Sequence, residues 1–361
     1  MPKVPPIPGL LGGVAIAVIA IALLASAYYW QQLLQHQAEY EAAERRHLET
    51  TARQISGAVG QQLDAMLRSI DVVTRHLAGV YLHDRSNFDA AAQDALAAFP
   101  EGTVQFVTVF DAEGYLVYSS NGNRERLYFG DREHFQAPRN DPADRLFISE
   151  PIVGRISGVP LVQLTRAIRD GEDFLGVIGL PLRPDHLSKS LYELHRGPND
   201  LISVLRSDGS FIARSRNLGE ALKHKVPADR PYLKAGPGAQ GTFRSISAID
   251  KIPLLFAWNR LSNWPVTVNV GLNEEDALAP LLNDHRMARH RALQATGALL
   301  LAALFIALLL QRIDRRNQAL VESEQRFRHF FEANKSVMLL IRPADGRIVA
   351  GNAAAAEFYG Y

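Results

Sequence analysis

The sequence of 361 residues contains no cysteine. This absence excludes disulfides, thiolate metal sites and a cysteine nucleophile. It does not decide between a reducing and an oxidising compartment. Any domain outside the cytoplasm must therefore be stabilised by its hydrophobic core alone.

An excess of charge of either sign is also missing. The chain has 39 Lys and Arg residues and 38 Asp and Glu residues, which gives a formal net charge of +1. The Arg residues are scattered among the acidic residues and form no basic stripe. We therefore expect no nucleic-acid partner.

Motifs for catalysis and metal binding are absent as well. The 11 His residues include no H-x-x-H or H-E-x-x-H pattern, and His285 and His290 are five apart, off the same-face helical spacing. No G-x-S-x-G sequence occurs, and the glycines of the 154–158 loop join two predicted strands rather than a strand and a helix. No kinase nucleotide motif follows His329, so we do not expect a phosphoacceptor there. We expect no catalytic residue, no metal and no cofactor in this chain.

Two long apolar runs are present. Residues 292–310 carry no charged side chain and are flanked by Arg291 and Arg312. As a helix this run is roughly 28 Å long, close to the ~30 Å hydrocarbon core of a bilayer, and it predicts a transmembrane helix.

Residues 9–30 form the second apolar run, after an N-terminal segment, 1–8, that we place in the cytoplasm. The aromatic residues at its end are typical of a membrane interface. The sequence Ala25-Ser26-Ala27 also resembles a signal-peptide cleavage site. An uncleaved transmembrane helix is the favoured interpretation, because a polar helical pattern continues directly from the run.

That polar pattern extends from residue 31 to about residue 81. Apolar residues recur at steps of three, four or seven, which predicts one long helix with an apolar stripe for a core or a dimer contact. The stripe consists of Leu48, Ile55, Val59, Leu63, Met66, Ile70, Val73, Leu77 and Val80.

Three segments share one pattern, in which two apolar runs flank a turn with an acidic residue and glycine. They are residues 104–119, 201–215 and 337–352. Such turns between alternating runs indicate β-hairpins. Further strands are predicted at 146–153, 161–169, 174–182, 241–249, 254–261 and 266–272, and helices at 131–137, 184–194, 273–291 and 311–335. The pattern predicts an α+β fold with related modules built on antiparallel sheets.

The segments Asp131–Asp170 and Val204–Ser215 resemble the double Cache, or PDC-like, sensor domains of bacterial receptors. The resemblance covers residues 31–291. It implies two tandem PAS-like (Cache) modules on a long N-terminal helix, a distal one at about 82–195 and a proximal one at about 196–272. These modules would be extracytoplasmic.

Residues 336–361 resemble the start of a PAS domain, with Asn352 after two strands and Phe358-Tyr359-Gly360-Tyr361 in the following helix. A PAS domain needs roughly a hundred residues to close its core. We expect an incomplete cytoplasmic PAS domain behind a signalling helix at 311–335, and hence a fragment of a longer protein.

In the amino-acid-binding relatives, an Arg beside aromatic residues binds the ligand carboxylate, while a Tyr and an Asp on later strands complete the site. Arg132 and Phe135 match the start of this motif, but His134 replaces the usual aromatic, Ile152 the Tyr and Pro181 the Asp. The resemblance therefore implies a carboxylate or other acceptor ligand without an obligatory α-amine. The candidate ligand-binding residues are Tyr118, Arg132, His134, Phe135, Phe147, Ser149, Gln163 and Thr165.

The resemblance implies a multi-pass receptor of the bacterial inner membrane that binds a small molecule and dimerises through its long helices. Its alternatives are a fragment of an enzyme, either a diguanylate cyclase with or without a phosphodiesterase or a sensor histidine kinase. A chemoreceptor is disfavoured, because a PAS start rather than a long coiled coil follows residue 310. Orientation rests on the resemblance, since Arg residues flank the second apolar run on both sides.

Overall fold

The computed structural model describes residues 10–100 and 102–360. These residues form two compact units, one of residues 40–282 and the other of residues 10–39 together with 283–360. The predicted cytoplasmic segment 1–8 lies outside the described residues.

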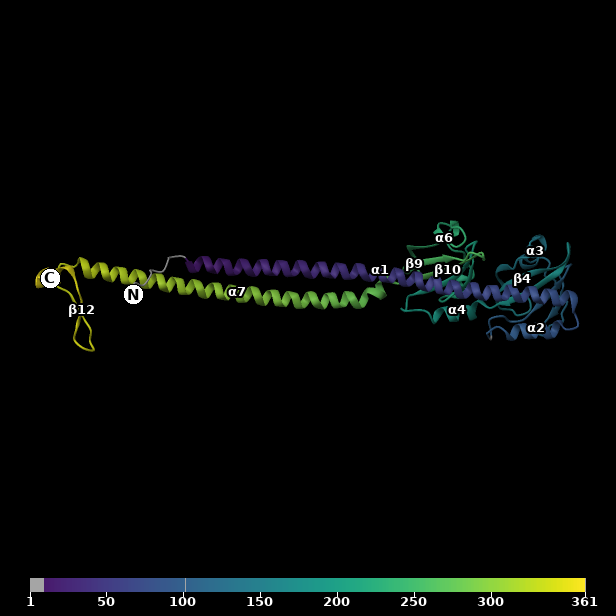
Figure 1. Ribbon diagram of the computed structural model, residues 1–361, viewed down its shortest axis with the longest axis horizontal. Helices are drawn as coiled ribbons and strands as arrows, with labels where there is room; N and C mark the ends of the chain where they lie inside the picture. Colours follow the sequence, from purple (N-terminus) through teal and green to yellow (C-terminus); the bar gives the residue numbers. More distant parts are fainter. Residues whose placement is uncertain (1–9, 101, 361) are drawn as a thin grey trace. The chain divides into compact units, whose positions relative to one another are not determined.

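Helix α1 (Leu10–His83) is unbroken, and its residues from 40 onward belong to the larger unit. All nine residues of the predicted apolar stripe pack in one core with both sheets, and Leu48, Val59, Leu63, Ile70 and Leu77 are buried there. Figure 1 shows α1 lying along one sheet and then the other. The long amphipathic helix is thus confirmed as a core element.

Two five-stranded sheets with the same topology form the rest of this unit, which confirms the α+β class and the two antiparallel-sheet modules. Each begins with a hairpin, continues with a three-stranded meander and returns its last strand to pair with its first, all antiparallel. The first has the order β2-β1-β5-β4-β3, from β1 (Thr108–Asp111), β2 (Leu116–Ser119), β3 (Phe147–Val153), β4 (Pro160–Asp170) and β5 (Asp173–Leu182). The second has the order β7-β6-β10-β9-β8, from β6 (Leu201–Arg206), β7 (Phe211–Arg214), β8 (Gln240–Ile246), β9 (Pro253–Arg260) and β10 (Val266–Leu272).

The hairpin turns explain why this pattern was visible in the sequence. Gly114, Gly209 and Gly346 have φ angles of 93°, 87° and 66°, a backbone region that favours glycine. The turn aspartates accept hydrogen bonds from backbone N–H groups, as Asp111 Oδ1 does from Tyr115 at 2.7 Å. The third hairpin, β11 (Leu339–Ile341) and β12 (Ile348–Gly351), belongs to the other unit and is followed by α8 (Ala353–Tyr359).

Short helices cover the sheets. They are α2 (Phe88–Ala97), α3 (Glu133–Asn140), α4 (Pro184–Tyr192), α5 (Leu218–Ala221) and α6 (Pro231–Lys234). Helix α2, which the sequence pattern did not predict, buries Phe88 and Ala92 in the core that contains α1. Helices α3 and α6 supply Phe135 and Tyr232 to two separate apolar clusters, each on the sheet face that points away from α1.

Helix α7 (Glu274–Ala333) begins directly after β10. Asn273 caps it, because its Oδ1 accepts a hydrogen bond from the Asp276 N–H at 2.7 Å. The buried Asp200, which precedes β6, accepts bonds from the N–H groups of Asn273 at 3.1 Å, Arg196 at 3.0 Å and Gly197 at 2.8 Å. One carboxylate therefore joins the start of the second sheet to the start of α7.

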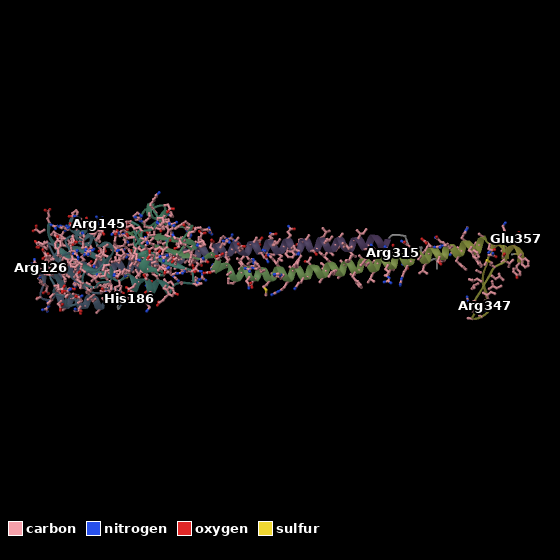
Figure 2. All side chains as sticks on the ribbon, turned by 180° about the vertical axis from the view of Figure 1, so that it is seen from behind. Arg126, Arg145, His186, Arg315, Arg347 and Glu357 are labelled. Carbon is pink, nitrogen blue, oxygen red and sulfur yellow. The ribbon has the colours of Figure 1, made fainter. Side chains whose placement is uncertain are left out.

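Both α1 and α7 contain stretches long and apolar enough to cross a membrane, and most side chains in these stretches are not buried. The predicted runs 9–30, from residue 10 on, and 292–310 lie in these helices. Within their unit the two helices are in contact: Trp30 Nε1 donates to Thr296 Oγ1 at 3.1 Å, and Arg289 Nε donates to Gln37 Oε1 at 2.7 Å. Arg315 follows the apolar stretch of α7 (Figure 2).

Candidate ligand-binding site

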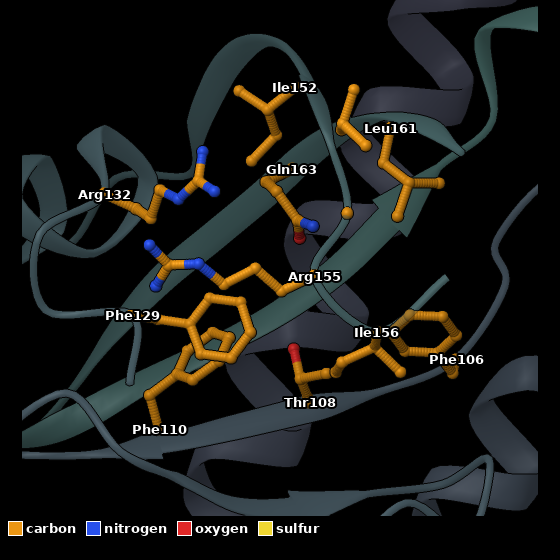
Figure 3. Close-up of a pocket in the computed structure, with 12 residues that line it drawn as sticks. Phe106, Thr108, Phe110, Phe129, Arg132, Ile152, Arg155, Ile156, Leu161 and Gln163 are labelled. Atoms are coloured by element: carbon orange, nitrogen blue, oxygen red, sulfur yellow. The ribbon is translucent and has the colours of Figure 1, made fainter. Parts of the chain in front are cut away.

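A small pocket lies on the face of the first sheet that does not contact α1. Strands β1 and β4, the start of α3 and the loop 154–158 form its walls (Figure 3). It encloses about 10 Å³, close to the space that one water molecule needs. Its lining residues are Phe106, Thr108, Phe110, Phe129, Arg132, Ile152, Val153, Gly154, Arg155, Ile156, Leu161 and Gln163.

Arg132 lies at the N-terminal end of α3, in extended backbone just before the first helical residue. Its side chain extends into the pocket beside Gln163 (Figure 3). Among the residues that the structure describes, Arg132 forms no ion pair, because the adjacent Asp131 binds Arg155 instead. The pocket thus contains a guanidinium group available to an anion.

Gln163 enters from β4 and is 7% exposed. Its Oε1 atom is buried without a hydrogen-bond partner, whereas its backbone N–H donates to Ser149 Oγ at 2.9 Å. Buried amide groups are normally hydrogen-bonded. An unpaired oxygen at the pocket wall therefore marks a place for a polar ligand atom.

His134 and Phe135 lie behind Arg132 in the core of the site. His134 is 1% exposed, its Nε2 has no partner, and its ring lies 5.9 Å from that of Phe110 and 6.1 Å from that of Phe129. Burial, reinforced by the positive charge of Arg132, lowers the pKa of His134 to about 4. The imidazole is therefore uncharged at pH 7 and packs as a neutral ring beside Phe110 and Phe129.

The other four predicted residues have different places. Ser149 and Thr165 fix neighbouring backbone, and the Thr165 hydroxyl donates to the His134 carbonyl at 2.8 Å. Tyr118 lies on the α2 side, where its hydroxyl donates to Asp89 at 2.7 Å. Phe147 lies under the guanidinium of Arg206, 5.8 Å away. The structure thus brings Arg132 and Gln163 to the pocket, with His134, Phe135, Ser149 and Thr165 around it, but not Tyr118 or Phe147.

Arg155 is a charged pocket residue that the sequence pattern did not single out. It projects from the 154–158 loop, donates to both carboxylate oxygens of Asp131 at 3.0 and 2.8 Å, and lies 5.5 Å from the ring of Phe129. These hydrogen bonds hold the pKa of the Asp131 carboxyl below its usual value. An Arg in a glycine-bounded loop was visible in the sequence, but its partner depends on the loop conformation.

The pocket also lacks a counter-charge for an amine. Ile152 lines it, Pro181 does not, and no lining residue in the described chain is Asp or Glu. Asp131 is nearby but already paired with Arg155. The electrostatics of the pocket therefore favour an anion.

Comparison with known proteins supports the fold. No family model matches the chain, and no curated protein matches it either. Among solved structures, the extracellular domain of rpHK1S-Z16, a candidate histidine kinase, is 24% identical, with a TM-score of 0.57, and the match covers 64% of this chain and 97% of that one.

Two chemoreceptor domains are also similar, at lower sequence identity. The ligand-binding domain of Pseudomonas fluorescens CtaA, in complex with L-isoleucine, is 14% identical, with 66% and 98% of the two chains covered and a TM-score of 0.52. That of the Pseudomonas aeruginosa PAO1 amino acid chemoreceptor PctB, in complex with L-Arg, is 15% identical, with 65% and 98% covered and a TM-score of 0.51. The chain therefore has the two-sheet fold of extracellular ligand-binding domains found in receptors of more than one class.

Proposed function

We propose that this chain is a membrane-bound sensor that binds a small carboxylate in the pocket of its first module. The observation that carries the proposal is the unpaired guanidinium of Arg132 beside the unpaired, buried Oε1 of Gln163. The fold supports it, since solved domains of this fold include complexes with amino acids.

The chemistry selects the ligand class. A guanidinium group binds a carboxylate through two parallel hydrogen bonds, and the low dielectric of a half-closed site strengthens them. An amine would need a neighbouring carboxylate, and the lining residues provide none. A carboxylate whose other polar group is a hydroxyl or amide fits better than an α-amino acid.

Binding requires the pocket to open, because its volume of about 10 Å³ is too small for any organic ligand. We propose that the 154–158 loop moves on binding, because it forms one wall of the pocket and Arg155 links it to Asp131, the residue before Arg132. An anion between Arg132 and Arg155 would compete with Asp131 for Arg155. Loop movement is thus coupled to binding by one exposed ion pair.

The test is ligand-induced thermal stabilisation of the full chain in detergent with acetate, pyruvate, succinamate and L-leucine, of which succinamate has both a carboxylate and an amide. At a ligand concentration about 100 times the Kd, binding stabilises the folded state by about 2.7 kcal/mol, a shift of several degrees in Tm. At least one amine-free carboxylate should produce this shift. Arg132→Ala should abolish it, because the anion loses the guanidinium that forms no ion pair with any described residue.

Arg145→Ala is the matched control. Arg145 lies on the surface of the same module, with its side chain 73% exposed and paired only with Asp141 (Figure 2). It should keep the wild-type response. A response that survives Arg132→Ala, or one confined to L-leucine, would contradict the proposed site.

Further parts of the proposal concern the membrane and the output. We propose that α1 and α7 cross the bacterial inner membrane, that residues 31–291 lie outside it, and that two copies associate along their long helices. Residues 336–361 would begin a cytoplasmic PAS domain that relays the signal to a diguanylate cyclase or histidine kinase. The similar solved domains come from a candidate histidine kinase and from chemoreceptors, so the fold favours neither class of output.

A further inference from the structure

The second module has a pocket at the same place in its sheet as the first. In the first sheet Thr108 pairs with Ser119 and Gly179, and in the second Ser203 pairs with Arg214 and Asn269. Thr108 and Ser203 are therefore equivalent, as are Gly179 and Asn269. Both Thr108 and Ser203 line a pocket on the sheet face opposite α1.

The second pocket is larger than the first and has different polar side chains in its walls. It encloses about 30 Å³, room for about two water molecules, so this pocket too must widen to admit an organic ligand. Its walls include Arg214, Arg230, Tyr232 and the aromatic ring of Phe243. Asn269 occupies the position where the first module has Gly179, so this pocket has an amide at its base.

That amide is buried and unpaired. Asn269 is 5% exposed, and its Oδ1 has no hydrogen-bond partner. Across the pocket, Arg214 is 1% exposed, and its Nε is likewise buried without a partner, although its terminal nitrogens bind Asp250. Burying an acceptor and a donor without partners costs free energy, so the pair is suited to a ligand that offers one of each.

The charge of the site favours an anion. Asp250 neutralises Arg214. Arg230, whose side chain is 14% exposed, donates to Ser245 Oγ and to the Ile246 carbonyl, and its one acidic partner among the described residues is Asp229, at 4.0 Å and 78% exposed. One positive charge is thus left at the pocket wall. A hydroxyl could donate to Asn269 Oδ1 while a carboxylate accepts from Arg214 Nε and faces Arg230.

We infer that the second module binds a hydroxycarboxylate of two or three carbons between Asn269, Arg214 and Arg230. The inference is independent of the site at Arg132. It places a ligand against β10, whose last residue, Leu272, directly precedes Asn273, the residue that caps α7. Asn269 lies five residues before Glu274, the first residue of the helix that contains the second apolar run.

The experiment is calorimetric titration of the full chain in detergent with sodium glycolate. Sodium acetate lacks the hydroxyl, and ethylene glycol lacks the carboxylate, so each removes one half of the recognition. Glycolate should bind at least about tenfold more tightly than either. In the Arg132→Ala variant, which removes the proposed first site, equal binding of acetate and glycolate, or no binding of glycolate, would overturn the inference.

Two variants locate the site. Asn269→Leu, of similar volume, should weaken glycolate binding at least about tenfold, whereas Arg132→Ala should leave it within about twofold. If Asn269→Leu does not fold, Arg230→Met tests the same pocket from its more exposed wall, with the same expected loss. Loss of glycolate binding in Arg132→Ala, together with retention in the second-module variants, would assign the ligand to the first module and overturn the inference.

Discussion

At the level of single residues, His134 links the pocket to the stability of the fold. Its pKa is about 4 in the folded protein and about 6.5 in an unfolded chain. Above pH 6.5 it is neutral in both states. Between pH 6.5 and 4 the unfolded chain binds a proton that the folded protein does not bind, so stability falls as the pH is lowered. The total loss is on the order of 3 kcal/mol.

The measurement is the free energy of unfolding from pH 7 to pH 4.5 for the wild type and His134→Phe. Phenylalanine keeps an aromatic ring beside Phe110 and Phe129 but cannot be protonated. The variant should lose less stability on acidification. His195, whose pKa burial also lowers, is present in both proteins and cancels in the comparison. Parallel pH profiles would show that His134 does not carry this dependence.

Among secondary-structure elements, the contact between α1 and β4 depends on a buried arginine. Arg166 is 1% exposed and binds Asp71 of α1 and Asp144, with its Nε donating to Thr74 Oγ1 at 3.3 Å. Asp71 also pairs with Arg75, whose side chain is 60% exposed and whose Nη2 lies 2.8 Å from Asp71 Oδ2. Two arginines thus bind one carboxylate, one inside the protein and one at its surface.

This arrangement allows a matched comparison. Arg166→Met should destabilise the protein by about 3 kcal/mol or more, because it leaves Asp71 and Thr74 without their buried partner. Arg75→Ala should cost less than about 1 kcal/mol, as exposed ion pairs usually do. Chemical denaturation of both variants measures the difference. Similar losses would mean that Arg166 acts only as a surface charge.

Arg166 also shows how far the sequence predicted the fold. Alternating apolar residues and Asp-Gly turns predicted the strands of both sheets, because side-chain alternation and positive φ are local properties. The pattern did not predict that both faces of β4 are buried, with Val162 and Leu164 toward α1 and Gln163 and Thr165 toward the pocket side. From the sequence alone, Arg166 would be predicted to be solvent-exposed, because its partner on α1, Asp71, becomes evident only in the structure.

The candidate site was less predictable than the sheets. Arg132 and Gln163 were proposed as ligand residues, but Arg155 and Asn269 were not, since their significance depends on loop conformation and on missing hydrogen bonds. Tyr118 was also proposed as a ligand residue. The structure places it against Phe88 of the unpredicted α2 instead, on a hairpin with a β-bulge between Val109 and Phe110. Register and tertiary contacts, not residue type, decide these cases.

At the scale of residues 40–282 as a whole, ion pairs join the two sheet modules. Arg206 of β6 binds both carboxylate oxygens of Glu133, the first residue of α3, at 2.9 and 3.1 Å. Lys225 contacts Glu150 at 2.5 Å and Asp208 at 2.6 Å. The helix that begins beside Arg132 is therefore fixed directly to the second module.

A double-mutant cycle of Glu133→Gln and Arg206→Gln measures that link. Because Glu133 is 48% exposed, we expect a coupling of roughly 0.5–1 kcal/mol in the free energy of unfolding. A second cycle, of Glu133→Gln with the distant Arg145→Ala, should be additive. A coupling of zero in the first cycle would mean that the Glu133–Arg206 pair does not contribute to holding the two modules together.

The hydrogen bonds of Asp200 have a consequence for how such a protein can change. Because Asp200 binds the N–H of Asn273, residues 201–272 leave the rest of the chain and return to it at one point. A segment with adjacent ends can be exchanged for another without moving the chain on either side of it. Residues 201–272 also pack against α1 and pair with Glu133 and Glu150 of the first module, so a replacement of the same topology has to keep those contacting residues while its pocket changes. New recognition could then be acquired without rebuilding the helices that carry it.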